Sequence, residues 1–183
     1  VFILFALDTK IHSKQDFEKL SPKIPVVTEV PFIEESQRTI QKNDRSVLAE
    51  AFRILRTNVN YLLPMHQEGK GAVIFCGSSI KGEGKTFVSL NMALTYASLD
   101  KKTIIVGGDL RNPQLHKYLH LDKNRMGLSN YLHDPTVEWQ SLINENNFKN
   151  EYLDIIFAGS VPPNPAELLS NGRFAVLLES LRA

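Results

Sequence analysis

Residues 72–86 read AVIFCGSSIKGEGKT, an apolar run that passes directly into a glycine-rich loop ending in lysine and threonine. A helical stretch from Lys85 to about Ser98 follows the loop, and a second apolar run covers Thr103 to Val106. Strand, loop, helix and strand in this order predict a crossover between parallel strands buried on both faces. We therefore expect an α/β fold, with a mostly parallel sheet and helices on both of its faces.

The loop itself, GSSIKGEGKT at 77–86, has the composition of a phosphate-binding loop. Its backbone N–H groups can all point at phosphate oxygens only where glycine allows a positive φ, here expected at Gly82 and Gly84. The positive end of the following helix would face the same phosphates. Lys85 would reach the β- and γ-phosphates, and the Thr86 hydroxyl would bind Mg²⁺. The loop therefore predicts binding of ATP or ADP together with Mg²⁺.

This loop departs from the pattern G-x-x-x-x-G-K-[ST] at its first position, where Ser79 replaces glycine. Its place between an apolar strand and an amphipathic helix is the one that the motif requires. The alternative is an ordinary glycine-containing turn with a surface lysine. The residues predicted to contact the nucleotide are Ser79, Lys81, Gly82, Glu83, Gly84, Lys85, Thr86 and Phe87.

A long amphipathic helix is expected before the loop. Apolar residues recur there at spacings of three and four and form one stripe that would face the core. The stripe consists of Leu48, Phe52, Leu55, Val59 and Leu62, and the helix should end before Pro64. After the second strand, Tyr152–Phe157 (YLDIIF) predicts a third. Further helices are expected at 114–118, 136–144, 165–170 and 172–183.

The N-terminal part of the chain has a different character. Ser13–Asp16 (SKQD) has the pattern of a capping box and predicts a helix through about Leu20. Prolines punctuate the next stretch, in which 24–30 (IPVVTEV) offers one short strand. The polar segment 34–46 is expected to be a mobile linker. The compact domain should then begin near Val47.

The first seven residues, VFILFAL, are all apolar. A membrane-spanning helix needs roughly 20 apolar residues, so this run alone does not complete one. No basic region precedes it and no small-residue cleavage site follows it, which disfavours a signal peptide. From the run alone, it either packs in the soluble domain or is the end of a truncated membrane helix.

Composition excludes several classes of protein. The 183 residues, of which 43% are hydrophobic, suffice for one globular domain with an appendage. A formal net charge of +1 gives no basic surface for nucleic acid. The single cysteine, Cys76, excludes an intrachain disulfide, fits a reducing compartment and is expected to be a small buried hydrophobe. The histidines at 116, 120 and 133 lack metal-ligand spacing.

Beyond the loop, IIVGGDLRNP at 104–113 resembles the second nucleotide motif of the deviant P-loop ATPases, an apolar strand ending in Asp-x-Asp-x-Arg. Only the second aspartate, Asp109, is present, and Arg111 follows it. Gly107 stands where that motif usually has its first aspartate. The septum-site and plasmid-partition ATPases share this motif, but their loop usually has a signature lysine where this chain has Ile80.

Three further segments carry a closer resemblance. EAFRILRTN at 50–58 resembles an E-x-x-R-x-x-R oligomerisation motif, MGLSNYL at 126–132 a Gly-Leu-Ser segment, and GSVPPNPAELL at 159–169 a G-x-x-P-P-N-P-x-E-L-L segment. Together with the loop, they are similar to the bacterial tyrosine kinases, or BY-kinases, which regulate capsule and exopolysaccharide export. The resemblance covers nearly the whole chain and implies a P-loop NTPase fold of the deviant Walker type.

This resemblance implies an ATP-dependent protein tyrosine autokinase with Mg²⁺ as cofactor. The implied catalytic residues are Lys85, Asp109 and Arg111, with Thr86 and Asp109 at the metal. Lys85 would neutralise phosphate charge, Thr86 would bind Mg²⁺ directly and Asp109 would bind it through water. Arg111 would orient Asp109 or contact substrate, unless its role is structural. Rival hypotheses are a partition-type ATPase switch and a non-catalytic nucleotide-binding adaptor, which Gly107 makes plausible.

The resemblance also implies partners and a location. Glu50, Arg53 and Arg56 would build a homo-oligomeric ring. Without the resemblance, a solvated face with weak internal ion pairs is the favoured interpretation of these residues. A neighbouring subunit's tyrosine tail would be the substrate, and a protein tyrosine phosphatase is a candidate partner. The domain would face the cytoplasm at the bacterial inner membrane.

The same resemblance divides the chain into three parts. Residues 1–7 would end a truncated transmembrane helix, 8–46 would be the juxtamembrane segment and linker, and 47–183 would be the kinase domain. On this interpretation the domain is truncated at its C-terminus. Its third motif, an apolar strand ending in aspartate, and its tyrosine cluster would lie beyond Ala183.

Overall fold

The computed structural model describes residues 11–33, 39–63, 69–122, 125–145 and 147–183. The apolar run at 1–7 and part of the expected linker lie outside these residues. No helix within the described ranges is long and apolar enough to cross a membrane. In chain order the elements are α2 (Lys14–Leu20), α3 (Val47–Leu62), α4 (Lys85–Ala97), β1 (Thr103–Val106), η2 (Leu115–Leu119), α5 (Leu128–His133), η3 (Trp139–Leu142), η4 (Asn147–Lys149), β2 (Leu153–Ile156), α6 (Pro165–Ser170) and α7 (Arg173–Arg182).

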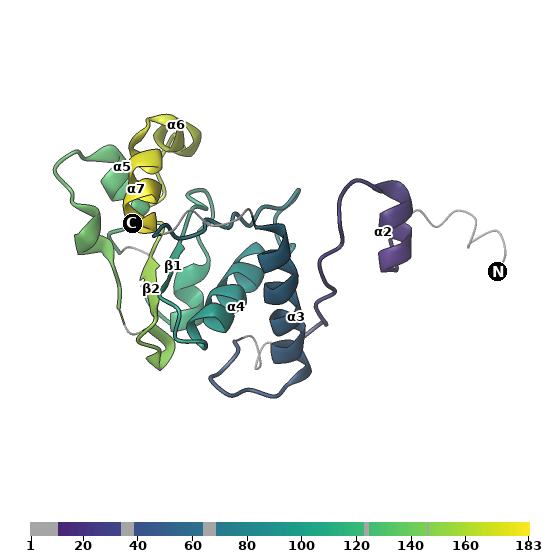
Figure 1. The fold of residues 1–183 in the computed structure, drawn as a ribbon. Coiled ribbons are helices and arrows are strands. Elements are labelled where there is room, and N and C mark those ends of the chain that lie inside the picture. Colours follow the sequence, from purple (N-terminus) through teal and green to yellow (C-terminus); the bar gives the residue numbers. More distant parts are fainter. Residues whose placement is uncertain (1–10, 34–38, 64–68, 123–124, 146) are drawn as a thin grey trace.

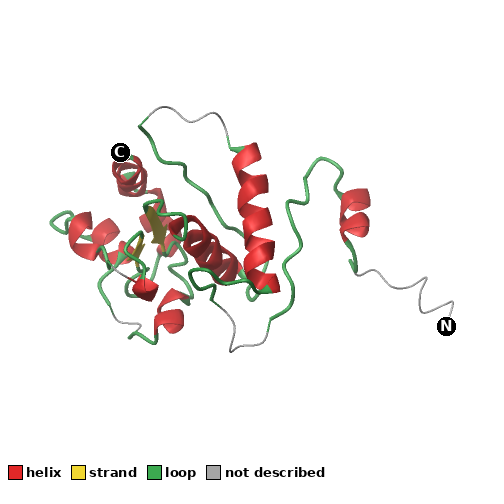
Figure 2. Cartoon of the chain, turned by 60° about the horizontal axis from the view of Figure 1, so that its bottom comes forward, coloured by secondary structure: helices red, strands yellow, loops and turns green. Residues whose placement is uncertain are grey.

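A parallel pair of strands forms the centre of the fold, as expected. β1 pairs with β2 in a register that places Ile105 opposite Ile155. Side chains alternate between the two faces of a strand, so Ile155 packs with Leu90 and other residues of α4, whereas Ile156 packs with Leu177 of α7 and residues of α5. Helices thus cover both faces of the sheet, with α4 between the strands and α3 in both views (Figure 1, Figure 2).

The expected strand at 72–76 does not form, and this prediction was wrong for the described chain. Val73, Ile74 and Phe75 are 48%, 41% and 91% exposed. Just before them, the Gly71 N–H donates to the Arg182 carbonyl of α7 at 2.8 Å. A strand needs a neighbour for its backbone groups, and no described strand lies beside this segment. This apolar run therefore has no strand partner among the described residues.

The short strand expected at 24–30 is also absent from the structure. The segment instead lies along α3, where Val27 and Val30 pack against the cluster around Phe52. The Asn58 side chain of α3 donates to the Val27 carbonyl at 2.5 Å. Pro25 within the run and Pro31 directly after it lack the N–H groups that a strand would need.

Most of the predicted helices are confirmed. α3, α4, α6 and α7 match the expected ranges closely, and α2 begins with the Ser13 hydroxyl accepting from the Asp16 N–H at 3.3 Å. Two differ in type, because 114–118 and 136–144 contain only the 3₁₀ turns η2 and η3. In the second case Asn144 bridges Ile155 of β2, which draws the chain out of a helical path.

The contact between α3 and α4 forms the third part of the core. Phe52 of α3 is fully buried and meets Phe87 of α4 edge to face, with ring centroids 5.8 Å apart. Ile40 joins the same cluster, and its N–H donates to the Asn91 side chain at 2.9 Å. The packed part of the chain therefore includes residues before Val47. This contact fixes α4, and with it the loop that precedes α4.

Candidate nucleotide site

The glycine-rich loop leads into the N-terminus of α4. Gly82 and Gly84 have φ of 95° and 91°, as the sequence predicted. Gly84 is the N-cap of α4, and no side chain caps this helix end. The first N–H groups of a helix have no partners within it, and the helix dipole places partial positive charge there. The start of α4 can thus accept an anion such as a phosphate.

Lys85 is held across the loop by a residue that sequence reasoning missed. Its ammonium Nζ donates to the Ser78 hydroxyl at 2.8 Å, and that hydroxyl donates to the Ile80 carbonyl at 2.8 Å. The sequence could have indicated this bond, because Ser78 is the first hydroxyl of the loop and Lys85 follows it by seven residues. Ser78 therefore belongs to the site.

Glu83 also bonds within the loop. One carboxylate oxygen, Oε2, accepts from the N–H groups of Ser79 and Ile80 at 2.9 and 3.1 Å. Lys81 and Gly82 are exposed at the tip of the loop. Phe87 was predicted to contact nucleotide, but its ring packs on Phe52. Only the backbone N–H of Phe87, in the first turn of α4, remains as a candidate contact for a bound anion.

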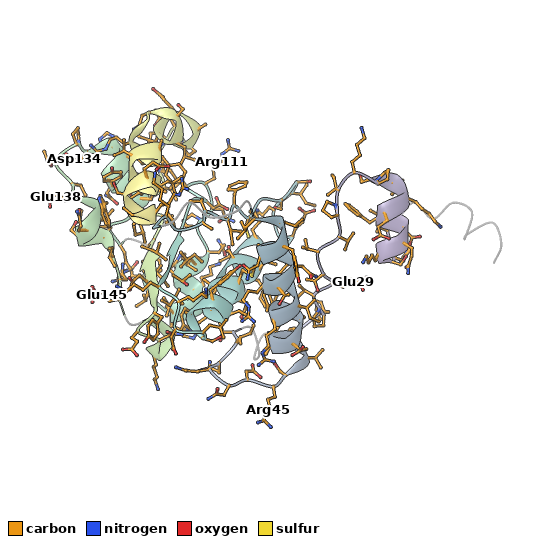
Figure 3. The ribbon with its side chains drawn as sticks, in the orientation of Figure 1. Glu29, Arg45, Arg111, Asp134, Glu138 and Glu145 are labelled. Carbon is orange, nitrogen blue, oxygen red and sulfur yellow. The ribbon has the colours of Figure 1, made fainter. Side chains whose placement is uncertain are left out.

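Asp109 lies in the turn that follows β1. Its Oδ1 accepts from the N–H groups of Arg111 and Asn112 at 3.2 and 2.9 Å, so the carboxylate braces this turn. The Arg111 side chain is exposed and points away from the ribbon (Figure 3). The ion pairs of the described residues do not join Arg111 to Asp109. What connects these two residues is the N–H of Arg111.

Gly107 occupies a tight position between the ends of the two strands. Its N–H donates to the Ile156 carbonyl at 2.8 Å. A Cβ atom added there would lie 2.8 Å from the Ala158 nitrogen and 3.3 Å from the Phe157 carbonyl carbon. Because these are backbone atoms, any side chain at 107 requires the strand ends to move apart. Only glycine fits at position 107 without such a movement.

The segment at 126–132 supports the end of β2. The N–H groups of Leu128 and Ser129 donate to the carbonyls of Phe157 and Ala158, both at 2.8 Å. A Cβ atom on Gly127 would collide with the Phe157 carbonyl oxygen. The Gly-Leu-Ser segment thus holds, by backbone hydrogen bonds, the residues that connect β2 to the segment 159–169.

The three charged residues of α3 do not form one cluster, because only Glu50 and Arg53 contact each other. Arg53 pairs with Glu50 at 2.9 Å and also donates to the Asp44 carbonyl. Arg56 donates to the Thr95 carbonyl near the end of α4 at 3.5 Å. Both arginines therefore make contacts within their own chain. Glu50 remains the exposed member, with 61% of its side chain accessible.

Two observations limit the chemistry of the site. Burial raises the pKa of the Cys76 thiol just before the loop, so it stays protonated near neutral pH and is a poor nucleophile. Among the described residues, no three His, Cys, Asp or Glu side chains gather as metal ligands. Any divalent ion would depend mainly on ligand and water oxygens, with Thr86 and Asp109 as the candidate protein contacts.

Comparisons with known proteins give consistent results. A Klebsiella pneumoniae protein named as a candidate tyrosine-protein kinase in the cps region is 38% identical over 138 residues, which are 75% of this chain and 18% of that protein. The tyrosine-protein kinase YwqD of Bacillus subtilis is 33% identical over 127 residues, 69% of this chain and 51% of that one.

Solved structures extend the similarity to most of the chain. The kinase domain of the Escherichia coli tyrosine kinase ETK is 29% identical to this chain, with a TM-score of 0.75. The chimerical protein CapA2B2 matches with a TM-score of 0.71. The ETK match covers 93% of this chain and 68% of that one. No family model matches. The chain thus spans about half or less of the two curated relatives named above.

Proposed function

The chain belongs to the bacterial tyrosine-protein kinase family, and on that premise we propose that it binds Mg·ATP and Mg·ADP in the loop before α4. The observation that carries this proposal is the loop itself. Positive φ at Gly82 and Gly84 leads into a helix end without a side-chain cap, and Lys85 lies across the loop. Backbone donors, helix dipole and ammonium group then act together on the phosphates.

The residues present suit a magnesium nucleotide. Mg²⁺ prefers oxygen ligands and usually keeps several waters, so one hydroxyl and one carboxylate suffice from the protein. Thr86 at the start of α4 and Asp109 after β1 supply these groups. When bound, Mg²⁺ would offset the negative charge of the phosphates. Lys85 would exchange its bond to Ser78 for the β- and γ-phosphates.

The proposed reaction is transfer of the γ-phosphoryl group of ATP to a tyrosine hydroxyl of a neighbouring subunit, which leaves ADP and phosphotyrosine. The protein's task in such a transfer is positioning and electrostatic stabilisation. Lys85 and the amides at the start of α4 would hold the phosphates in place. Asp109 would help to hold the metal, while Arg111, exposed beside it, would meet the incoming substrate.

Capsular or exopolysaccharide chain length and export would be the process that this kinase regulates. Its proposed setting is the inner face of a bacterial membrane, with the domain in the cytoplasm and a phosphatase as a further partner. Assembly into a ring through α3 is part of this proposal. The exposed Glu50 carboxylate is the member of the charged motif best placed to reach another subunit.

A second candidate, a nucleotide-binding adaptor with weak or no catalysis, is favoured by one observation. Gly107 replaces a carboxylate of the family motif, and its close approach to Ala158 leaves no room for a side chain. A developing charge in phosphoryl transfer needs a fully assembled metal site. This second candidate would bind Mg·ADP without phosphorylating tyrosine.

A fluorescent ADP analogue tests the nucleotide site. We expect the chain to bind it more tightly with Mg²⁺ than with EDTA, and the Thr86→Val variant to lose most of that difference because its hydroxyl is gone. Thr57→Val, an exposed position on α3, is the matched control. Binding that is absent, or that ignores Mg²⁺ in the unmodified chain, would contradict the proposal. Anti-phosphotyrosine blots after incubation with ATP distinguish kinase from adaptor.

A further inference from the structure

Two internal links close the glycine-rich loop without any ligand. One runs from the Lys85 ammonium through the Ser78 hydroxyl to the Ile80 carbonyl. The other runs from the Glu83 carboxylate to the N–H groups of Ser79 and Ile80. Ile80 therefore uses both its N–H and its carbonyl inside the loop. These bonds fix the first half of the loop relative to the start of α4.

The links also divide the backbone donors between two tasks. The N–H groups of Ser79 and Ile80 are engaged by the Glu83 carboxylate. The donors at the start of α4 have no partner within the helix, because an N-terminal turn leaves its first N–H groups unpaired. A carboxylate next to a phosphate site would ordinarily repel the ligand. Here a single oxygen, Oε2, accepts both bonds, and such charge-assisted bonds are the stronger kind.

We propose that Glu83 is a positioning residue, whose carboxylate braces the loop so that the amides at the start of α4 and Lys85 are held ready for the phosphates. The proposal rests on the nucleotide-binding function proposed above and assigns Glu83 a task other than direct contact. Ordering a flexible, glycine-rich loop on binding would weaken affinity. A loop that is already braced avoids that loss. Ser78 contributes the second link by directing Lys85 across the loop.

The opposite role is a plug, in which the carboxylate occupies a place that phosphate must take. The two roles predict opposite signs for removal of the side chain. Loss of a brace weakens nucleotide binding, whereas loss of a plug strengthens it. The Glu83→Gln variant removes the charge and keeps the hydrogen-bond acceptor, because the amide carbonyl oxygen of glutamine can accept both bonds that Oε2 accepts.

Titration of Mg·ADP into four forms of the full chain tests the proposal. Relative to the unmodified chain, Glu83→Ala is expected to bind about fivefold more weakly, as two hydrogen bonds of modest net strength are lost. Glu83→Gln should return affinity to within about twofold. Glu138→Ala removes the same charge from a distant exposed position (Figure 3) and should change nothing. Equal or tighter binding by Glu83→Ala would overturn the brace.

A second measurement needs no nucleotide, so it stands even if the chain binds none. Amide proton resonances of Ser79 and Ile80 are expected downfield in the ligand-free chain, to move upfield in Glu83→Ala and to remain near their original positions in Glu83→Gln. Resonances that ignore the alanine substitution would overturn the proposal. Failure of the unmodified chain to bind Mg·ADP, with the resonances behaving as expected, would instead overturn the proposed function and leave only the bracing of the loop by Glu83.

Discussion

A methyl group at position 107 has no room, because its carbon would lie 2.8 Å from the Ala158 nitrogen. At the next residue, Gly108, an added Cβ would meet nothing within 4 Å. Neighbouring glycines in one sequence motif thus have different physical roles. The first permits close approach of two strand ends, and the second does not depend on the absence of a side chain.

We therefore expect Gly107→Ala to destabilise the chain by about 1–3 kcal/mol, the usual range for overpacking at a tight contact. Gly108→Ala should change stability by less than about 0.5 kcal/mol. Urea denaturation of both variants measures the difference. Equal midpoints would show that the strand ends separate easily, and Gly107→Asp could then restore the missing carboxylate without strain.

Asp154 gives the fold a pH dependence. Burial raises the pKa of this β2 carboxyl above 3.8, and the nearby Glu145 adds to the rise. A group whose folded pKa lies above its unfolded value binds more protons when folded, so its contribution to stability falls as pH rises through that interval. The ionised form is thus unfavourable to folding at neutral pH.

Asp154→Asn should consequently raise the melting temperature at pH 7 and give a smaller gain as pH falls towards 3.8. Asp134 provides the opposite case, since the Thr136 hydroxyl and N–H lower the pKa of its carboxyl. Asp134→Asn should lower the melting temperature at pH 7. Thermal melts of both variants at pH 7 and pH 4 test the pair, and a gain for Asp154→Asn that is the same at both values contradicts this account.

Individual loop residues show how far sequence reasoning reached. Positive φ at Gly82 and Gly84 followed from the demands of a phosphate-binding loop and is confirmed. The bonds of Ser78 and Glu83 were not predicted, because they depend on how the loop folds back on itself. Which backbone groups a side chain will reach cannot be read from spacing alone. The backbone conformation of these glycines was predictable, and the hydrogen bonds within the loop were not.

At the scale of elements, helices were easier to predict than strands. α3 and α6 end within the expected bounds because periodicity and proline are local signals. The apolar segment 72–76 carries an equally clear local signal and remains unpaired. A helix satisfies its backbone internally, whereas a strand depends on a neighbour that the local sequence does not specify.

Amide hydrogen exchange tests this difference. Ile105 and Ile155, paired in the centre of the sheet, should exchange slowly, whereas Ile74 and Phe75 should exchange close to the rate of an unstructured peptide. Gly71, whose N–H is bonded to Arg182, should fall between these limits. Protection at Ile74 as strong as at Ile105 would show that the segment pairs in solution.

At the scale of the whole molecule, α3 is the proposed subunit contact. Its apolar side holds it to its own domain through the buried Phe52. Arg53 adds two polar contacts within the chain, to Glu50 and to the Asp44 carbonyl, and Arg56 adds one, to the Thr95 carbonyl. Replacing both arginines with alanine should therefore leave the monomer folded, with stability lower by about 1–3 kcal/mol. Assembly of the full-length cytoplasmic region should decrease.

Analytical ultracentrifugation with circular dichroism measures both outcomes. A variant with Arg45→Ala and Lys117→Ala removes the same charge from exposed positions and should assemble normally. If the arginine variant sediments as the unmodified protein does, the charged residues of α3 do not form the subunit contact. The alternative, a solvated face with internal ion pairs, would then hold.

The central claim is that the loop before α4 binds a magnesium nucleotide through Lys85. Calorimetric titration of Mg·ADP into the unmodified chain and into Lys85→Met tests it most directly. Methionine keeps most of the length and packing of lysine and removes its charge, and circular dichroism can verify that both proteins are folded. We expect measurable binding by the unmodified chain and none by Lys85→Met. Equal affinity in the two folded proteins would contradict the claim and remove Lys85 from the site.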